Sequence, residues 1–268
     1  MKKIVIMGAT SGIGLHVTEK LAARGYMVGA AGRNTVALEQ LGKLYPDNIR
    51  VARIDVTDPD APTRLGELIA AIGGMDTYFH VAGIGFDSYP LDPAKEEATM
   101  QTNVMGFTRM IDAAFCYFRD RNGGRGHIAA ITSVAGTNGI GRLASYSASK
   151  AFQQTYLKAL DQQAHIAGMH LRFTDIRPGW VRTPLLDNNQ NYPMIMQLPY
   201  AVKRIINAVR HNRRVAVIDW RWNLLVGLWR LVPDCLWVRL PIKVSSLATA
   251  RQTRLNAAEA VEDQQGVS

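Results

Sequence analysis

Two residues near the middle of the chain, Tyr146 and Lys150, have the types and the spacing that acid–base chemistry requires. They lie four residues apart in a stretch with a helical pattern, so their side chains would share one helix face. An ammonium close to a phenol favours the phenolate and lowers the phenol's pKa from its usual value of about 10. Tyr146 would then exchange a proton near neutral pH. The same spacing also arises by chance on helix surfaces, so the pair needs support from the rest of the chain.

A glycine-rich turn near the N-terminus provides the first support. A short β-branched run ends at Met7 and is followed by Gly8-Ala9-Thr10-Ser11-Gly12-Ile13-Gly14, which opens a helical pattern. Phosphate groups bind the backbone N–H groups at a helix N-terminus, where glycine keeps side chains out of the way. We therefore predict that this turn binds a dinucleotide, although its Gly-x3-Gly-x-Gly spacing differs from the common Gly-x-Gly-x2-Gly fingerprint. The alternative is an ordinary glycine-rich turn between a strand and a helix.

The residue after the second predicted strand indicates which dinucleotide. An acidic residue there accepts from the ribose 2′-hydroxyl of NAD, whereas an arginine accommodates the 2′-phosphate of NADP. The strand ends in Ala31-Gly32-Arg33-Asn34, so Arg33 takes this position. We expect NADP(H) to be favoured over NAD(H), the alternative being a solvated loop arginine.

Short β-branched runs alternate with longer amphipathic stretches, the pattern of βα units and a parallel sheet. We predict an α/β fold of the Rossmann type, a doubly wound parallel sheet of about seven strands with helices on both faces. The predicted strands are Ile4–Met7, Met27–Ala31, Val51–Ile54, Thr77–Val81, His127–Thr132, His170–Ile176 and Val215–Asp219. The predicted helices are Ile13–Arg24, Thr35–Tyr45, Thr63–Ile72, Ala98–Arg121 and Ser145–Ala167. No linker divides the chain, so we expect one catalytic domain over 1–219, with a helical extension over 220–268 packed on it.

Taken together, these motifs resemble the short-chain dehydrogenase/reductase family over about residues 1–185. Besides the glycine turn, the resemblance rests on six further motifs in the family's order. They are Asp55-Val56, His80-Val81-Ala82-Gly83, Asn103-Val104-Met105-Gly106, Ser133, Tyr146-x3-Lys150 and Pro178-Gly179.

The resemblance implies a role for each matching position. In the catalytic group, Ser133 would hydrogen-bond the substrate carbonyl, Tyr146 would transfer its proton, and Lys150 would bind the nicotinamide ribose and lower the Tyr146 pKa. Asn103 would anchor a water that links Lys150 to solvent. The implied cofactor-binding set adds Gly8, Thr10, Ser11, Gly12, Ile13, Gly14, Arg33, Asp55, Val56, Ala82, Gly83, Pro178, Gly179, Val181 and Thr183.

The fourth strand departs from the family's pattern, because His80-Val81 replaces the usual pair of asparagines. A histidine that ends a strand is more often a hydrogen-bonded core residue than a ligand. The six histidines show no metal-ligand spacing, and we expect no metal.

Cysteine content and charge restrict the protein class further. Cys116 and Cys235 are the only cysteines and form no Cys-x-x-Cys pair, which fits a reducing, cytoplasmic compartment. No apolar run reaches the roughly 20 residues of a membrane span. The whole net charge of +9 falls within 201–256, which hold eleven Lys/Arg against Asp219 and Asp234. We do not expect nucleic-acid binding, because no recognised module accompanies these basic residues.

The stretch from Trp222 to Val232 is apolar nearly all round, and Asp234–Leu240 predicts a second short helix. Three interpretations stay open for this region. The helices could cover the core or a dimer interface, and a homo-oligomer is expected in this family. Trp and Leu beside Arg are also typical of helices that lie on a membrane, which would give peripheral membrane contact through 220–243. Finally, with Pro193-Met194-Ile195-Met196, they could line a greasy substrate pocket.

We therefore predict an NADP(H)-dependent oxidoreductase that transfers a hydride between nicotinamide and a carbonyl or secondary alcohol of a lipophilic small molecule. One alternative is a non-catalytic NADP(H) sensor on the same fold, although such proteins usually lose the catalytic tyrosine or lysine. Another is an epimerase or dehydratase, whose longer C-terminal sugar-nucleotide domain is missing here.

Overall fold

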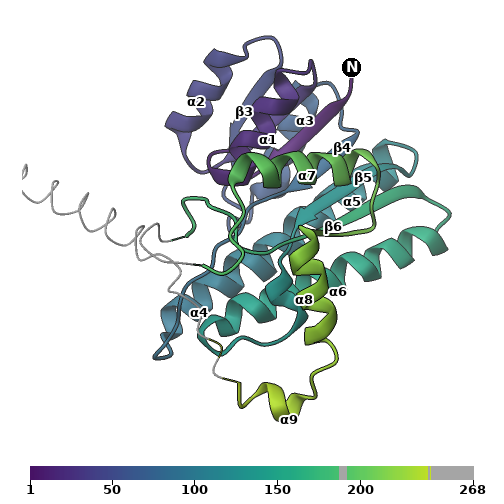
Figure 1. Cartoon of the computed structure of the whole chain (residues 1–268). Helices are drawn as coiled ribbons and strands as arrows, with labels where there is room; N and C mark the ends of the chain where they lie inside the picture. Colours follow the sequence, from purple (N-terminus) through teal and green to yellow (C-terminus); the bar gives the residue numbers. More distant parts are fainter. Residues whose placement is uncertain (187–191, 241, 243–268) are drawn as a thin grey trace, which may run out of the picture.

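The β-branched runs of the sequence form a single parallel sheet, as the computed structural model of residues 1–186, 192–240 and 242 shows (Figure 1). The sheet has seven strands in the order β3-β2-β1-β4-β5-β6-β7, all of them parallel. The strands are β1 (Lys3–Met7), β2 (Met27–Gly32), β3 (Ile49–Arg53), β4 (Thr77–His80), β5 (Arg125–Ile131), β6 (His170–Pro178) and β7 (Val215–Ile218). The predicted fold class and strand number are confirmed.

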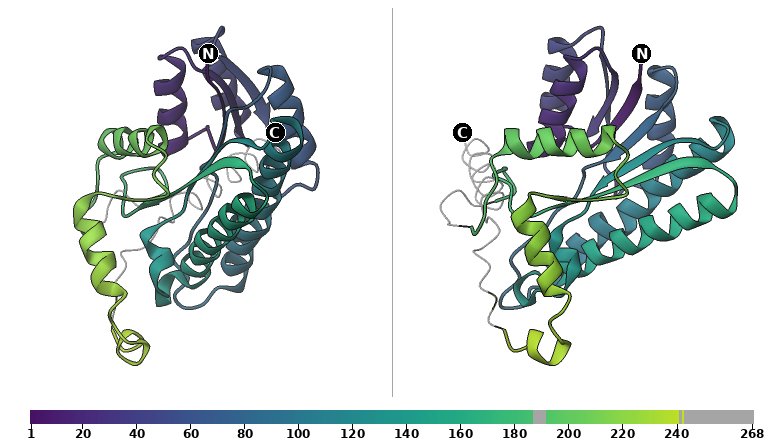
Figure 2. Two further views of the ribbon diagram at one scale, coloured as in Figure 1. Left: turned by 90° about the vertical axis from the view of Figure 1, so that its right-hand side faces the viewer. Right: turned by 45° about the vertical axis from the view of Figure 1, so that its right-hand side comes forward.

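Helices cover both faces of the sheet, as Figure 2 shows. The elements on one face are α1 (Gly12–Ala22), α2 (Thr35–Leu44), α7 (Leu198–Arg210) and α8 (Trp220–Trp229), which bury their apolar sides in one core cluster. The other face carries α3 (Ala61–Ala71), α5 (Phe107–Arg121) and α6 (Ala144–Ile166), which contribute to a second cluster. Strand residues alternate between the two clusters: Ile4 and Ile6 belong to the first, and Val5 and Met7 to the second. The chain is therefore doubly wound.

The predicted helix over Ala98–Arg121 differs in its boundaries and its continuity. Helix α4 (Pro93–Met100) starts earlier, and a π-helical segment (Gln101–Gly106) separates it from α5. At Gly106 a Cβ would stand 2.7 Å from the Val56 side chain, so the backbone passes close to the loop after β3. Such π turns are rare and often occur at functional sites. The break places Asn103 in the irregular turn.

Helix α7 was not predicted from the sequence. Its buried positions Val202, Ile205 and Ile206 follow helical spacing and belong to the first core cluster. Other boundaries shift by a few residues, for example β3, which begins at Ile49 rather than Val51.

The C-terminal region after β7 begins with α8 and a short α9 (Asp234–Trp237). Asp219 caps α8 by accepting a hydrogen bond from the Arg221 backbone N–H (3.0 Å). One side of α8 joins the core through Trp222 and Val226. The remainder of the expected extension, residues 241 and 243–268, lies outside the described residues. Within the described ranges, no helix has the length and apolar character that crossing a bilayer requires.

Two short 3-10 segments, Val134–Thr137 and Gly141–Leu143, connect β5 to α6. Loops after β1, β4, β5 and β6 all leave the carboxyl edge of the sheet, where the strand order reverses between β1 and β4. Ligands of open α/β sheets bind at this reversal. The predicted site residues lie on these loops and on the helices that follow them.

Candidate active site

Three elements bring the predicted catalytic residues together at the carboxyl edge of the sheet. Ser133 follows β5, Asn103 lies in the π turn, and Tyr146 and Lys150 lie in the first turns of α6. The Ser133 hydroxyl lies within hydrogen-bonding reach of the Tyr146 phenol. The Lys150 ammonium stands 5.6 Å from the centre of the Tyr146 ring. Four polar side chains from three segments of the chain therefore share one site.

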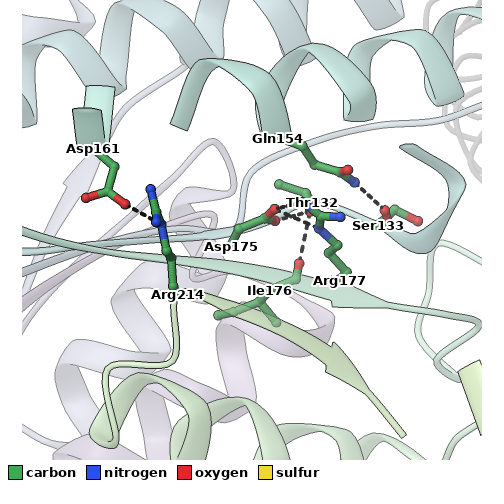
Figure 3. Close-up of polar contacts among 8 residues, drawn as sticks. All are labelled: Thr132, Ser133, Gln154, Asp161, Asp175, Ile176, Arg177 and Arg214. Atoms are coloured by element: carbon green, nitrogen blue, oxygen red, sulfur yellow. Dashed lines mark hydrogen bonds and ion pairs between the residues drawn. The ribbon is translucent and has the colours of Figure 1, made fainter. Parts of the chain in front are cut away.

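Ser133 is held by contacts of its own backbone and side chain. Its hydroxyl accepts from the Ala135 N–H (3.1 Å) and lies 3.5 Å from the Pro178 carbonyl. Its main-chain carbonyl accepts a 2.7 Å hydrogen bond from Gln154 Nε2 on α6 (Figure 3). Gln154 therefore ties the end of β5 to the helix that carries Tyr146.

A buried polar network fixes the strands directly beneath Ser133. Thr132 donates to Asp175 Oδ1 (2.5 Å), and Arg177 pairs with Asp175 Oδ2 through Nε (2.7 Å) and Nη2 (2.5 Å) (Figure 3). All three side chains are buried. A paired buried carboxylate holds β5 and β6 in register while its charge acts on nearby groups.

The Tyr146 ring has little freedom to move. A Cβ at Gly85 would stand only 2.5 Å from ring atom Cδ2, so the loop after β4 passes directly against the ring. Burial raises the pKa of Tyr146, and the hydrogen bond with Ser133 opposes that rise. The sequence-based expectation was a lowered pKa. The structure gives the opposite direction, because desolvation of the phenol outweighs the hydrogen bond with Ser133.

The hydrogen-bond partners of Lys150 are the Ile131 carbonyl (3.1 Å) and Gln153 Oε1 (3.0 Å). The side chain is buried, and burial lowers the pKa of Lys150 from 10.5 to about 8, against the opposing pull of the Asp175 carboxylate. Lys150 is therefore a cation that titrates close to neutral pH. Two of its three hydrogens are committed to protein oxygens.

Asn103 uses its side chain to hold the loop after β4. Its Oδ1 accepts from the Ile84 N–H (2.9 Å), and its Nδ2 donates to the Ile84 carbonyl (2.7 Å) and to Ser149 Oγ (3.1 Å). Its main-chain carbonyl accepts from Gln153 Nε2 (2.8 Å). The expected role of Asn103 as a water anchor remains a prediction.

Three polar residues beside the catalytic group, Ser149, Gln153 and Gln154, were not predicted from the sequence. A signal was present for one of them, because Gln153 follows Tyr146 and Lys150 at positions i, i+4 and i+7 of one helix face. A glutamine on the same helix face as Tyr146 and Lys150 could have been predicted as a hydrogen-bond partner of one of them.

The glycine turn has the geometry that phosphate binding requires. Gly8 and Gly12 have positive φ angles of 96° and 50°. A Cβ at Gly14 would lie 2.0 Å from the Gly8 carbonyl oxygen, so only glycine lets α1 approach the turn this closely. Ser11 is extended and immediately precedes α1, and Ile13 lies in its first turn. The N–H groups at the start of α1 thus point out of a turn free of bulky side chains, which fits a dinucleotide pyrophosphate.

The residues expected around the adenosine lie beside this turn. Arg33 Nη1 lies 3.8 Å from Asp55 Oδ2, and the Thr10 side chain packs where a Cβ of Gly32 would be. Asp55 Oδ1 accepts from both the backbone N–H (3.0 Å) and the hydroxyl (2.8 Å) of Thr57. These bonds, with two nearby arginines, hold the pKa of Asp55 below its usual value although burial opposes them.

Three other expected cofactor residues stand on the neighbouring loops. Ala82 lies against Gly8, because a Cβ added at Gly8 would stand 2.6 Å from the Ala82 backbone nitrogen. A Cβ at Gly83 would stand 3.4 Å from Lys150 Nζ, so Gly83 brings the β4 loop close to the catalytic lysine. Val56 is buried next to Gly106, so its side chain faces the protein core.

The segment after β6 contacts both α8 and the glycine turn. Val181 is buried and pairs with Met196, and Gly179 leaves room for the Trp222 indole, which a Cβ would meet at 2.1 Å. Thr183 lies 3.4 Å from the Cβ position of Gly12, so this segment reaches across to the glycine turn. That Pro178–Thr183 closes over the nicotinamide remains a prediction.

His80 is a core residue of this structure. Its Nδ1 lies 3.0 Å from the Tyr78 hydroxyl, and its ring packs edge-on against Phe107 at 5.0 Å. Burial, with a smaller effect of the Lys150 charge, lowers the pKa of His80 to about 3, so the ring is neutral. Across the described ranges, no cluster of three or more His, Cys, Asp or Glu side chains has the geometry of a metal site.

The chain is similar in sequence to known oxidoreductases. The family model described as short chain dehydrogenase matches residues 2–192. An uncharacterised oxidoreductase of Mycobacterium tuberculosis is 33% identical over 246 residues, covering 88% of this chain and 95% of the relative. A 3-ketodihydrosphingosine reductase of Bacteroides thetaiotaomicron is 32% identical over 188 residues, or 69% of this chain and 66% of the relative.

Among solved structures, the closed form of serine dehydrogenase complexed with NADP⁺ is 28% identical, with a TM-score of 0.60 over 68% of this chain and 73% of that one. The range of the family model includes β1 to β6 and all four catalytic candidates. The chain is an oxidoreductase that belongs to the short-chain dehydrogenase/reductase family.

Proposed function

We propose that this protein is an NADP(H)-dependent reductase or dehydrogenase that interconverts a lipophilic carbonyl compound and its secondary alcohol. The convergence of Ser133, Tyr146 and Lys150 on one buried site carries this proposal. A non-catalytic sensor would not need a phenol, a hydroxyl and an ammonium in mutual reach.

Each of the three residues has a distinct task in the reduction direction. Bound NADPH supplies the hydride that adds to the carbonyl carbon. The negative charge that develops on the carbonyl oxygen is stabilised by the Ser133 hydroxyl and neutralised by the proton of Tyr146. The positive charge of Lys150 stabilises the phenolate that Tyr146 becomes. In the oxidation direction the same phenolate takes the proton back.

Arg33 supports the preference for NADP(H). It directly follows β2, where the sequence pattern places the contact with the 2′-phosphate, and its contact with Asp55 is long, at 3.8 Å, and partly exposed. An exposed pair of this kind contributes little, so Arg33 is available to a phosphate. Asp55 is hydrogen-bonded to Thr57 and lies in the loop after β3. The NADP⁺ complex of the related serine dehydrogenase points in the same direction.

An apolar cluster next to Tyr146 supports a lipophilic substrate. Its buried part consists of Ala135, Ile140, Leu143, Leu186 and Tyr192, and Tyr146 packs against it. Ligand sites combine such apolar walls with a few polar groups that orient the reacting atoms. The name of the Bacteroides relative refers to a ketone of a lipid, a substrate of this kind.

The C-terminal helices support peripheral contact with an anionic membrane. Four apolar side chains are more than half exposed and recur along α8 and the turn after it: Trp220, Leu224, Leu228 and Leu231. Arg230 and Arg239 lie in the same region. Exposed Trp and Leu flanked by Arg are typical of interfacial helices.

Membrane contact can be tested by co-sedimentation of the full chain with phosphatidylglycerol-rich vesicles. A Trp220→Gln/Leu224→Gln variant should bind these vesicles much more weakly than the wild type. Equal binding by the wild type and the variant would contradict membrane contact.

The test of the enzymatic proposal is NADPH oxidation by purified protein with ketones and aldehydes of increasing chain length. We expect the specificity constant to rise with chain length, and Tyr146→Phe to lower kcat by roughly 10²–10⁴-fold. Tyr146→Phe should still bind NADPH, which fluorescence titration would measure. If no carbonyl compound is reduced, or if Tyr146→Phe is as active as the wild type, the proposal fails.

A further inference from the structure

One buried glutamine links two of the catalytic candidates. Gln153 accepts a hydrogen bond from Lys150 Nζ through Oε1 (3.0 Å) and donates through Nε2 to the main-chain carbonyl of Asn103 (2.8 Å). Gln153 and Asn103 have no solvent-exposed surface, and Lys150 is 4% exposed. The three residues form a continuous chain between α6 and the π turn.

The partners of Gln153 allow only one orientation of its amide. An ammonium can only donate, and a carbonyl oxygen can only accept. The amide oxygen must therefore face Lys150 and the amide nitrogen must face Asn103, which is the arrangement observed. Neither an apolar side chain nor a carboxylate could satisfy both partners at once.

The same contacts limit what the link can do chemically. A carboxamide neither gains nor loses a proton near neutral pH, so it cannot pass a proton from Lys150 to Asn103. Its effect is geometric and electrostatic. With the Ile131 carbonyl (3.1 Å), it occupies a second hydrogen of the ammonium and leaves one for the open side of the site.

We propose that Gln153 is a positioning residue, which holds the Lys150 ammonium beside Tyr146 by bracing it against the Asn103 carbonyl in the π turn. This inference rests on the proposed function for the importance of Lys150. It assigns to a side chain the connection between Lys150 and Asn103 for which the family resemblance implies a water. In this proposal the π turn places the Asn103 carbonyl where Gln153 can donate a hydrogen bond to it.

Two substitutions of Gln153 should shift the pKa of Lys150 in opposite directions. Gln153→Glu keeps the shape and the acceptor but adds a negative charge, so the charged form of Lys150 is favoured. Gln153→Leu removes the acceptor and disfavours the charged form. The other groups that face Lys150 remain in place in both variants: Tyr146 on α6, His80 at the end of β4 and Asp175 on β6.

The readout is the pH dependence of Lys150 acetylation, followed by mass spectrometry on the full-length protein without nucleotide. In the wild type the labelling midpoint should lie near the Lys150 pKa of about 8. We expect an upward shift of about one unit or more in Gln153→Glu and a downward shift in Gln153→Leu. Gln163→Glu and Gln163→Leu, on the exposed side of the same helix, are the matched controls and should leave the midpoint unchanged.

Carbonyl reduction provides a second readout. Both Gln153 variants should lower kcat by about tenfold or more with a smaller change in KM, and the pH profile of kcat should shift with the labelling midpoint. Thermal unfolding identifies a variant that fails to fold, in which case the other Gln153 variant decides the question. Midpoints that do not move, or that move in the same direction in both folded variants, would overturn the inference even if Tyr146→Phe abolishes activity. Opposite shifts without any carbonyl reduction would support the link and refute the proposed function.

Discussion

The contact between Gly85 and the Tyr146 ring makes a sharp prediction about the geometry of the site. Replacing Gly85 with alanine would place a Cβ 2.5 Å from Tyr146 Cδ2 and 2.9 Å from Cε2. Carbon atoms in contact stand about 3.5–4.0 Å apart, so the ring must retreat by about 1 Å. That displacement separates the phenol from Ser133. A displacement of about 1 Å at a reacting group costs on the order of 10²-fold in rate, which is the loss of kcat we expect for Gly85→Ala.

The assay is steady-state NADPH oxidation with a ketone that the wild type reduces, together with thermal unfolding to confirm that the variant folds. Gly141→Ala is the matched control, because it lies in the loop that precedes α6 and a Cβ there meets nothing within 4 Å. We expect the control to keep the activity of the wild type. A Gly85→Ala variant that is folded and equally active would refute the idea that this ring position is required.

Three other predictions concern charge, pH and packing. Arg33→Asp should raise the KM for NADPH about tenfold or more, because it removes a charged partner of the 2′-phosphate. Lys43→Asp, an equal charge change on α2, should leave this KM unchanged. An unchanged NADPH preference in Arg33→Asp would show that Arg33 does not select the cofactor. Because burial lowers the pKa of Lys150 to about 8, the unfolded chain binds the proton more tightly than the folded chain between about pH 8 and 10.5. The unfolding free energy of the wild type relative to Lys150→Met should therefore rise with pH, by about 1.6 kcal/mol from pH 8 to 9.5 in urea titrations. A difference that stays constant with pH would contradict the assigned burial. Trp222→Ala should lower the unfolding free energy by about 3–5 kcal/mol, because this indole is buried against Gly179. Trp220→Ala, on the exposed side of α8, should change the unfolding free energy little. Equal effects of the two substitutions would mean that α8 does not pack as described.

The features that could be predicted from the sequence depend on local pattern. Strand ends, helix spacing and the glycine turn placed Gly8, Ser133, Tyr146 and Lys150 at one edge of a parallel sheet, and the structure agrees. These features follow from residue spacing along single elements and from the rule that parallel strands present their carboxyl ends together.

The features that could not be predicted depend on contacts between distant segments. The π turn at Asn103 accompanies the close approach of Gly106 to Val56, about fifty residues earlier in the chain. The predicted direction of the Tyr146 pKa shift was wrong because the shift depends on how deeply the phenol is buried, which residue spacing alone does not specify. Helix α7 has helical periodicity in the sequence, although it was not predicted.

The central claim is that Tyr146 protonates the oxygen of a carbonyl group that receives a hydride from NADPH. The most direct measurement uses NADPH deuterated at the transferred position, with mass spectrometry of the alcohol formed by the wild type and by Tyr146→Phe under single-turnover conditions. We predict that the wild-type product carries one deuterium on the former carbonyl carbon and that Tyr146→Phe forms it roughly 10²–10⁴-fold more slowly with unchanged NADPH affinity. A product without deuterium, or equal rates for the two proteins, would contradict the claim.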